Sequence, residues 1–218
     1  MINSTGIFLI RLVANDNRAG IIGLTAAVTI QDSLPRDHYS ITIVAIRWPT
    51  DTSCVAYPTT LAGAHYRPIP ASTPQLAQEA ELAHITYQKF KLHATKHPEL
   101  GIKFVKNFDF VSGAAVKNYE EFPQGYQDSV DEFHLLNETE KPPGVEFAAS
   151  YQTWCVDPVV FGCHLLRRFK LNGGLLVSQR LLAAEEAFEV APNVSVVVNC
   201  SGFGFGDPDV QIVRGSYI

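Results

Sequence analysis

Apolar and polar positions along the first fifty residues predict a strand, a helix and a second strand. The apolar run at residues 7–13 is typical of a short buried strand, and residues 20 to about 33 have helical spacing. The side chains available for the buried face of this helix are Leu24, Ala27, Val28 and Ile30. The β-branched run at residues 41–45 predicts another strand, which ends before Pro49. This order predicts a β-α-β unit.

The middle of the chain changes from helical spacing to alternation. Hydroxyl side chains and a proline at residues 72–74 predict the start of a second helix, which runs to about Lys96. Residues 101–112 alternate apolar and polar side chains, as an antiparallel strand does. Residues 118–144 are polar and rich in proline, so we expect irregular connections there, whereas residues 145–151 return to strand character.

The last third of the chain again alternates strands and helices. Residues 157–158 predict the start of a helix, and the Asn-Gly-Gly run at residues 172–174 predicts its end. Residues 175–181 are expected to form a strand, residues 183–188 a helical segment, and residues 194–198 an apolar strand. No internal repeat is evident. The pattern as a whole predicts an α/β fold.

Residues 19–27, with the sequence AGIIGLTAA, match most of a dinucleotide-binding turn. The full pattern is G-x-G-x-x-G between a strand and a helix. Gly20 and Gly23 keep the second and third glycines, which allow backbone to approach a pyrophosphate and helix to pack closely on strand. Arg18 stands where the first glycine is due, and residues 15–18 add polar length before the turn. The turn predicts a nucleotide fold and leaves open whether the nucleotide is still bound.

Composition narrows the class of protein. Of the 218 residues, 46% are hydrophobic and 18% are charged, as in a globular rather than a disordered chain. The net charge of -5 argues against a protein that binds nucleic-acid phosphates. We find no apolar run long enough to cross a membrane and no convincing signal peptide. The four cysteines lack C-x-x-C spacing, so we expect reduced thiols in an intracellular protein.

The strand predicted at residues 194–198 leads into a segment of small residues and glycine, NCSGFG at 199–204. Open α/β sheets hold ligands at the carboxyl ends of such strands. For this segment alone a plain turn is an equally good interpretation. The β-α-β unit at the start of the chain favours a nucleotide site.

Four segments, in order, resemble the flavin-dependent D-amino-acid oxidase family, which includes the D-aspartate oxidases. They are AGIIGLTAA (19–27), the strand and loop at 41–68, the strand–helix pair around DPVVFGCHLLRRF (157–169), and VVVNCSGFG (196–204) followed by VRG (213–215). The spacing from the second strand to Ala62-Gly63-Ala64-His65 is similar to that of fungal members. The segments cover most of this chain but only the first part of a usual family member.

This resemblance implies a fold, a cofactor and a reaction. The fold would be a Rossmann-like α/β FAD-binding domain with an interleaved, incomplete antiparallel β substrate domain. Residues 1–100 and 151–218 would form the FAD-binding domain, and residues 101–150 the substrate-domain segment. FAD is the implied cofactor. The implied reaction is oxidative deamination of a D-amino acid by hydride transfer to FAD, which O2 reoxidises.

The resemblance also implies which positions contact FAD. In chain order they are Gly20, Ile22, Gly23, Arg47, Ser53, Cys54, Ala62, Gly63, Ala64, Leu181, Ser201 and Gly202. The glycine turn would approach the pyrophosphate through its backbone, and the Ser-Cys pair would contact phosphate or ribitol. The Ala-Gly-Ala segment would lie along the isoalloxazine, and the backbone of Leu181 would contact the adenine end. The Ser-Gly pair at 201–202 would close over the nucleotide.

Two departures from the family pattern bear on activity. Ile46 stands where an acidic or basic residue normally follows the second strand, although Arg47 comes one place later and could reach a phosphate. A usual member also continues beyond the VRG segment. That continuation supplies an active-site tyrosine, an arginine that clamps the substrate carboxylate, and a last flavin contact, whereas this chain stops at Ile218. We therefore name no catalytic residue.

Two functional hypotheses remain open. The first is an FAD-dependent oxidase of a D-amino acid, known here from an incomplete sequence or gene model. The second is a truncated, non-catalytic FAD-binding relative. In either case we expect no nucleic-acid or membrane partner and an intracellular location, cytoplasmic or peroxisomal, although Ser216-Tyr217-Ile218 is not a peroxisomal signal. The D-amino acid and the oligomeric state are not readable from the sequence.

Several other side chains could carry chemistry. His93 and His97 are one helical turn apart, but with no third ligand nearby a solvated pair is favoured, so no metal site is predicted. Tyr66 and Arg67 resemble a binding pair, with packing and surface exposure at least as probable as binding. Cys54 and Cys200 are better interpreted as small buried side chains than as reactive thiols. These alternatives need the fold to separate them.

Overall fold

The computed structural model of the chain describes residues 8–14, 19–35, 39–51, 59, 62, 64–190, 192–201 and 205, with only the backbone described for residues 8–14. The chain packs as two units. Unit 1 consists of Met1–Ala62 and Pro158–Ile218, and unit 2 of Gly63–Asp157. Each unit has its own β-sheet, and we describe the two in turn.

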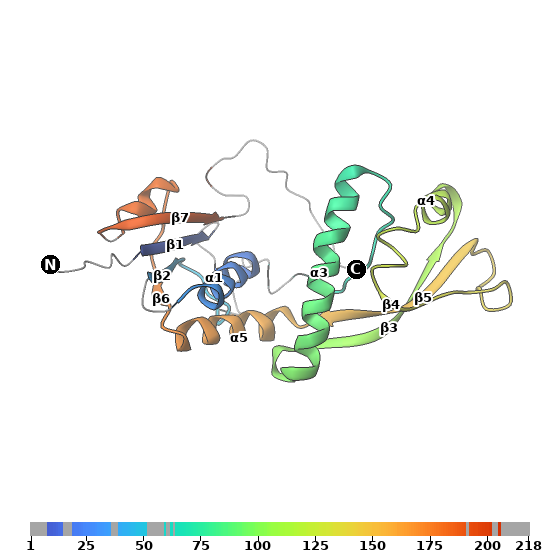
Figure 1. The fold of residues 1–218 in the computed structure, drawn as a ribbon, viewed down its shortest axis with the longest axis horizontal. Helices are drawn as coiled ribbons and strands as arrows, with labels where there is room; N and C mark the ends of the chain where they lie inside the picture. The colour runs from blue at the N-terminus through green and yellow to red at the C-terminus, as the bar shows by residue number, and fades with distance from the viewer. Residues whose placement is uncertain are drawn as a thin grey trace. The chain divides into compact units, whose positions relative to one another are not determined.

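A parallel sheet of four strands forms the centre of unit 1 (Figure 1). The strands, in spatial order, are β6 (Leu175–Val177), β2 (Tyr39–Val44), β1 (Phe8–Ala14) and β7 (Val194–Cys200). Residues 41–44 of β2 are all buried, because an inner parallel strand is covered on both faces. The β-α-β unit predicted from the first fifty residues is thus confirmed.

Two helices of unit 1, α1 (Ile21–Ser33) and α5 (Pro158–Leu171), pack against each other (Figure 1). Helix α1 buries Leu24, Ala27 and Val28, as its helical spacing predicts, whereas Ile30 is only half-buried; the helix also lies against β1 and β2. The two helices are joined by an ion pair in which Arg168 Nη2 lies 2.8 Å from Asp32 Oδ2. Both helix predictions are confirmed within a residue or two.

Unit 2 is built on an antiparallel sheet and one long helix. The sheet has the order β3 (Ile102–Val111), β5 (Phe147–Val156), β4 (Asp131–Leu135), and β3 pairs with β5 along all ten residues. The helix is α3 (Pro74–Lys96), whose amide at Leu76 donates to Oγ1 of Thr73, 3.2 Å away. This cap confirms the helix start predicted from the hydroxyl side chains and proline at 72–74.

Tyr87 joins α3 to the sheet of unit 2. Its side chain is the buried one on this helix, and its hydroxyl donates to the Gln152 carbonyl at 3.0 Å and accepts from the Asp131 amide at 3.1 Å. Burial raises the pKa of Tyr87 to about 12, so the phenol stays neutral and can keep both bonds.

Parts of the sequence prediction were wrong in detail. Residues 118–144 were expected to be irregular, yet α4 (Val116–Glu121) overlaps their start and β4 lies inside them. Strand β4 has a polar sequence and is held by pairing with β5, which a hydrophobic pattern does not reveal. The strand expected at 175–181 ends at Val177, and the helical segment expected at 183–188 is a 3₁₀ turn, η4 (Glu185–Phe188). Short 3₁₀ turns also occur as η2 (Pro98–Leu100) and η3 (Gly113–Ala115).

Units 1 and 2 are defined by how the chain packs. The domain boundaries predicted from the sequence, at 100/101 and 150/151, were instead defined by expected function. By packing, α3 and the whole of β5 fall in unit 2. The assignment of an FAD-binding and a substrate domain stays a prediction.

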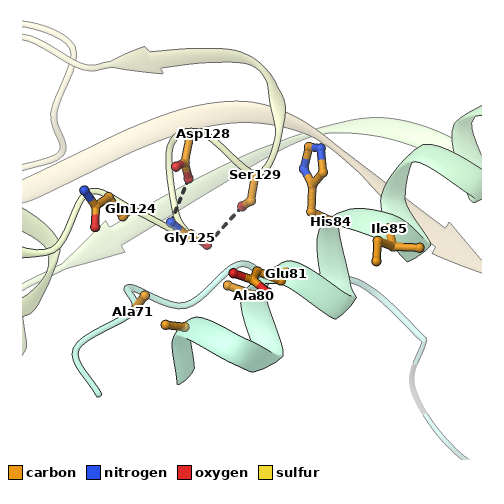
Figure 2. A pocket seen from close by; sticks show the side chains of 10 residues that line it. Ala71, Ala80, Glu81, His84, Ile85, Gln124, Gly125, Asp128 and Ser129 are labelled. Atoms are coloured by element: carbon orange, nitrogen blue, oxygen red, sulfur yellow. Dashed lines mark hydrogen bonds between the residues drawn. The ribbon is translucent and has the colours of Figure 1, made fainter. Parts of the chain in front are cut away.

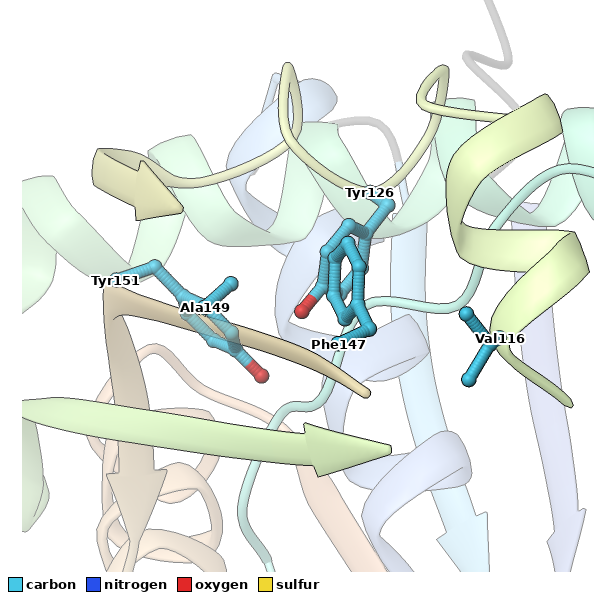
Figure 3. Packing of buried hydrophobic residues seen from close by; sticks show 5 residues of the cluster. All are labelled: Val116, Tyr126, Phe147, Ala149 and Tyr151. Carbon is cyan, nitrogen blue, oxygen red and sulfur yellow. The ribbon is translucent and has the colours of Figure 1, made fainter. Parts of the chain in front are cut away.

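The apolar core of unit 2 surrounds a buried carboxylate. The core consists of Val116, Tyr126, Phe147, Ala149 and Tyr151, contributed by α4, the loop before β4, and β5 (Figure 3). Asp109 of β3 is 1% exposed beside it. Its Oδ2 accepts from the Tyr151 hydroxyl at 2.7 Å and from the Tyr126 hydroxyl at 3.0 Å.

The other oxygen of Asp109 is also bound. Oδ1 accepts from Arg67 Nη2 at 2.7 Å and from Asn107 Nδ2 at 3.2 Å. Four donors therefore surround this carboxylate, which is what a buried charge requires. Burial, followed by the neighbouring negative charge and hydrogen bond of Asp109, raises the pKa of Tyr126, and burial likewise raises the pKa of Tyr151. Both phenols therefore remain protonated donors.

Removing either phenol donor should destabilise unit 2. Tyr126→Phe and Tyr151→Phe each delete a hydrogen bond to a buried carboxylate, which costs about 1.5–3 kcal/mol of unfolding free energy. Tyr119→Phe is the matched control, because the Tyr119 ring packs edge-to-face on Tyr126, whereas the phenols bonded to Asp109 are those of Tyr126 and Tyr151. Urea unfolding followed by circular dichroism measures the three values. Equal losses in all three variants would show that the phenol bonds to Asp109 add nothing.

Replacing Gly125 with alanine should destabilise the chain more than replacing Gly144, another glycine with positive φ. Its φ is +72°, and a Cβ there would lie 2.9 Å from Ala80 Cβ and 3.1 Å from Ala71 Cβ. Gly144 has φ +80° and nothing within 4 Å, so Gly144→Ala should cost only the backbone strain, about 1–2 kcal/mol. Gly125→Ala adds overpacking of about 1–3 kcal/mol. Thermal unfolding of the two variants tests this order, which is refuted if Gly144→Ala is the less stable.

Candidate functional site

The carboxyl ends of β2, β1 and β7 meet at one edge of the sheet in unit 1, since these three strands are neighbours and parallel. Gly20, Arg47 and Ser201 follow these strands in the chain. The Ala19 amide donates to the Arg47 carbonyl at 2.8 Å, which ties the turn after β1 to the turn after β2. This edge is where open α/β sheets bind ligands.

The N-terminus of α1 lies at this edge. Gly20 is the N-cap and provides no side-chain cap, while the Ile21 amide lies 3.4 Å from Oγ1 of Thr59. The Ile22 side chain is 68% exposed. The first amides of a helix have no acceptor within the helix, and they attract anions together with the helix dipole. Because the Ile21 amide donates to Thr59, the amides of Gly20 and Ile22 are the ones that suit a phosphate group.

Gly23 fits the close approach of α1 to β7. A Cβ at Gly23 would lie 3.4 Å from Cys200 Cβ, at the limit of ordinary contact. A larger side chain would push the helix away from the strand. Cys200 itself is half-buried, and burial raises the pKa of its thiol, so it is a packing group rather than a thiolate.

The turn after β2 contains an exposed arginine and a loop closed by a side-chain hydrogen bond. Arg47 is exposed, and the next amide, at Trp48, donates to Oδ2 of Asp51 at 2.9 Å. Trp48 Nε1 also donates to Ser178 Oγ at 3.2 Å, which connects this turn to the end of β6. A guanidinium in this position can bind a phosphate group at the same edge as α1.

The remaining residues predicted to contact FAD differ in their burial, and some lie outside the described residues. Leu181 is 4% exposed and packs with Val44 and Ala187, so only its backbone is suited to a ligand. Ser201 is buried, and its amide donates to Asn199 Oδ1 at 2.9 Å. Ala62 is exposed, whereas the Ala64 carbonyl accepts from the Val156 amide within unit 2. Ser53, Cys54, Gly63 and Gly202 lie outside the described residues, as does Arg18.

The structure thus brings Gly20, Gly23, Arg47 and Ser201 together at one sheet edge. Thr59 and Asp51 are polar groups at this site that the sequence interpretation missed. Their signal was weak, because an isolated hydroxyl and a loop carboxylate have no characteristic spacing.

A cavity in unit 2 with a volume of about 620 Å³ lies between α3 and the loop before β4 (Figure 2). The side chains of Ala80 and Glu81 point toward that loop, and His84 and Asp128 add ionisable groups. The Gly125 amide donates to Asp128 Oδ1 at 2.7 Å, so this carboxylate shapes the loop. Among the described residues no group of three histidine, cysteine or carboxylate side chains could hold a metal ion.

The sequence left open whether Tyr66 and Arg67 pack against the protein or bind a ligand. In the structure the two residues differ. The Tyr66 ring stacks on Trp154 with centroids 5.7 Å apart, which makes it a packing residue. Arg67 has a side chain that is 62% exposed, yet its Nη2 is held by buried Asp109. It is a surface cation fixed in place.

The sequence favoured a solvated pair at His93 and His97, and the structure has His97 exposed but His93 half-buried. Their rings lie 5.8 Å apart, and His97 Nδ1 is 3.3 Å from Glu99 Oε1. No helix in the described ranges of the chain is long and apolar enough to cross a membrane.

Comparisons of the sequence show relatives among amino-acid oxidases. The chain is 35% identical over 221 residues to a D-aspartate oxidase of Talaromyces thermophilus, covering 92% of this chain and 59% of that protein. It is 27% identical over 208 residues to a D-amino-acid oxidase of Schizosaccharomyces pombe, covering 92% and 57%. No family model matches the chain. The chain therefore spans less than two thirds of the length of these relatives.

Solved structures support the mixed α/β fold, at sequence identities that show fold alone. L-proline dehydrogenase from P. horikoshii aligns with a TM-score of 0.61 and 16% identity, over 90% of this chain and 54% of that one. Glycine oxidase from Bacillus cereus aligns with a TM-score of 0.57 and 12% identity, over 89% and 55%. The two sequence matches, each over 92% of this chain, show that the chain is homologous to D-amino-acid and D-aspartate oxidases.

Proposed function

We propose that the chain is an FAD-dependent oxidoreductase of the D-amino-acid oxidase type, acting in oxidative deamination of a D-amino acid. The observation that supports this most is the edge of the parallel sheet in unit 1. There a helix N-terminus with its glycine pair follows β1, an arginine follows β2 and a serine follows β7, and these three strands are neighbours. The homologous oxidases supply the identity of the ligand expected at that edge.

The pyrophosphate of FAD would be held at α1. The amides near Gly20 and Ile22 would donate to its oxygens, and the positive end of the helix dipole would favour its charge. Gly23 would keep α1 close to β7, so that these amides lie at the sheet edge. Arg47 would add a positive charge near the phosphates. No carboxylate directly follows β2 to bind the ribose hydroxyls.

The other expected contacts are carried over from the resemblance. Ser53 and Cys54 would contact phosphate or ribitol, and Ala62, Gly63 and Ala64 would lie along the isoalloxazine ring. Leu181 would offer its backbone to the adenine end, which agrees with the burial of its side chain. Ser201 and Gly202 would close over the nucleotide. When bound, FAD supplies the hydride acceptor for the amino-acid α-carbon.

A second candidate is flavin binding without oxidation. The relatives are longer than this chain, which covers 59% and 57% of the first two. Orienting a substrate carboxylate usually requires a guanidinium placed for that purpose. If that group lies in the remainder of the relatives, this chain would bind FAD and leave the amino acid unoxidised.

The purified chain should be yellow, with the visible absorption of bound flavin, and should consume oxygen with D-alanine or D-aspartate. Gel filtration with excess FAD followed by a visible spectrum measures the first property, and an oxygen electrode measures the second. A yellow protein that is inactive with both amino acids selects the second candidate. A colourless protein would refute FAD binding and, with it, both candidates.

A side chain at Gly20 should weaken FAD retention without unfolding the chain. Gly20→Val places a branched side chain at the α1 N-terminus, where backbone approach to a pyrophosphate requires glycine. We expect at least a ~tenfold rise in the Kd for FAD, equivalent to about 1.4 kcal/mol. Thr29→Val, exposed on the same helix, is the control and should bind FAD normally. Equal FAD affinity in both variants, measured by flavin fluorescence, would contradict a pyrophosphate site at α1.

A further inference from the structure

Another cavity of unit 2, with a volume of about 460 Å³, borders the aromatic core. Cavities that bind small molecules in proteins have volumes of about 300–1,000 Å³. Four aromatic side chains line this one, contributed by α4, the loop before β4, β4 itself and the start of β5: Tyr119, Tyr126, Phe133 and Phe147. The resemblance to the oxidases assigns no residue of this cavity to a ligand.

The aromatic rings on the wall are held in place before any ligand arrives. Tyr126 is 1% exposed, and its hydroxyl donates to buried Asp109. The rings of Tyr119 and Phe133 both meet Tyr126 edge-to-face, with centroids 4.8 and 5.4 Å away. Tyr119 and Phe133 are only half-buried, so part of each side chain remains open to a ligand. A wall that is already ordered lowers the entropic cost of binding.

The segment that builds most of the cavity is strongly acidic. Residues 118–146 contain eight carboxylates and one lysine, which gives a net charge of -7, whereas the whole chain carries -5. Lysines pair with three of these carboxylates: Lys91 with Asp131, Lys117 with Glu121, and Lys141 with Glu138. A cleft surrounded by charges of one sign attracts ions of the opposite sign.

Charges on the cavity wall have the same balance. Lys141 borders the cavity, but its Nζ lies 2.8 Å from Glu138 Oε1 and donates to the Glu146 carbonyl at 2.8 Å. Its positive charge is thereby compensated. The wall also contains the carboxylates of Glu120 and Glu146. Glu146 Oε1 accepts from the Gly113 amide at 2.8 Å, which leaves its second oxygen for a ligand.

We propose that this cavity binds a small apolar organic cation of the quaternary ammonium class. The faces of aromatic rings carry negative potential and attract such a cation, and the nearby carboxylates add to the attraction. An anion of the same size is repelled, and an uncharged molecule gains only the apolar contact. The site uses no flavin and no residue of the sheet edge in unit 1. It therefore goes beyond the proposed function and is tested separately from it.

The test is an NMR titration of the 218-residue chain with two probes of the same shape. One is choline, and the other is its uncharged carbon analogue, in which a tert-butyl group replaces the trimethylammonium group. Line broadening of the methyl proton signal reports the binding of each. We expect choline to bind at least ~fivefold more tightly than the analogue. Equal affinity for the two probes, or no saturable binding of choline across a millimolar range, would overturn the proposal.

A charge reversal on the wall separates electrostatic from apolar binding. Glu120→Lys should weaken choline binding ~fivefold or more and leave the affinity for the uncharged analogue unchanged. Glu79→Lys makes the same charge change on α3, outside this cavity, and is expected to bind choline as the wild type does. Glu120 is exposed, so its replacement leaves the core of unit 2 intact. Unchanged choline affinity in Glu120→Lys would contradict the site.

Two variants at Tyr119 test the role of the ring. Tyr119→Leu keeps an apolar side chain but removes the aromatic face, and it should weaken choline binding ~threefold or more. Tyr119→Phe keeps the face and loses the hydroxyl, so choline affinity should stay at the wild-type value. Circular dichroism confirms that each variant is folded. Equal choline affinity in the two variants would show that the aromatic face contributes nothing and would overturn the proposal.

Discussion

The parallel pairing of β1 with both β2 and β7 is the constraint on which unit 1 depends. It joins residues 8–14 to residues 39–44 and 194–200, segments that are far apart in the chain. Parallel strands place all their carboxyl ends at one edge, so this single arrangement collects Gly20, Arg47 and Ser201. None of these residues forms a site alone. The candidate site exists because β1 lies between the other two strands.

Local patterns predicted the elements of this arrangement well. The glycine turn, the β-branched run of β2 and the apolar run of β7 each have a signal within a few residues. The order β6-β2-β1-β7 has no such signal, since pairing between distant strands leaves no mark on short windows of sequence. The sequence therefore indicated which residues would contribute to the edge, while Thr59 and Asp51 emerged only from the folded arrangement.

Unit 2 was harder to predict for a physical reason. Its core is aromatic and polar together, with Tyr126 and Tyr151 directed at the buried Asp109. An aspartate in an alternating strand is expected on the exposed face, and only its four donors explain its burial. Strand β4 was missed for a related reason, because its polar sequence depends on pairing with β5. Both features are tertiary in origin.

The Asp109–Arg67 ion pair is poorly explained by stability alone. Burying a carboxylate costs several kcal/mol by general estimates, and an apolar side chain of similar volume often serves a core at least as well. The attraction is further reduced because the Arg67 side chain is 62% exposed and screened by solvent. The pair does, however, hold the exposed guanidinium of Arg67 in a fixed orientation at the surface of unit 2. The ion pair therefore costs stability in the core and gives unit 2 a surface guanidinium whose side chain is already ordered, which lowers the entropic cost of any contact it makes.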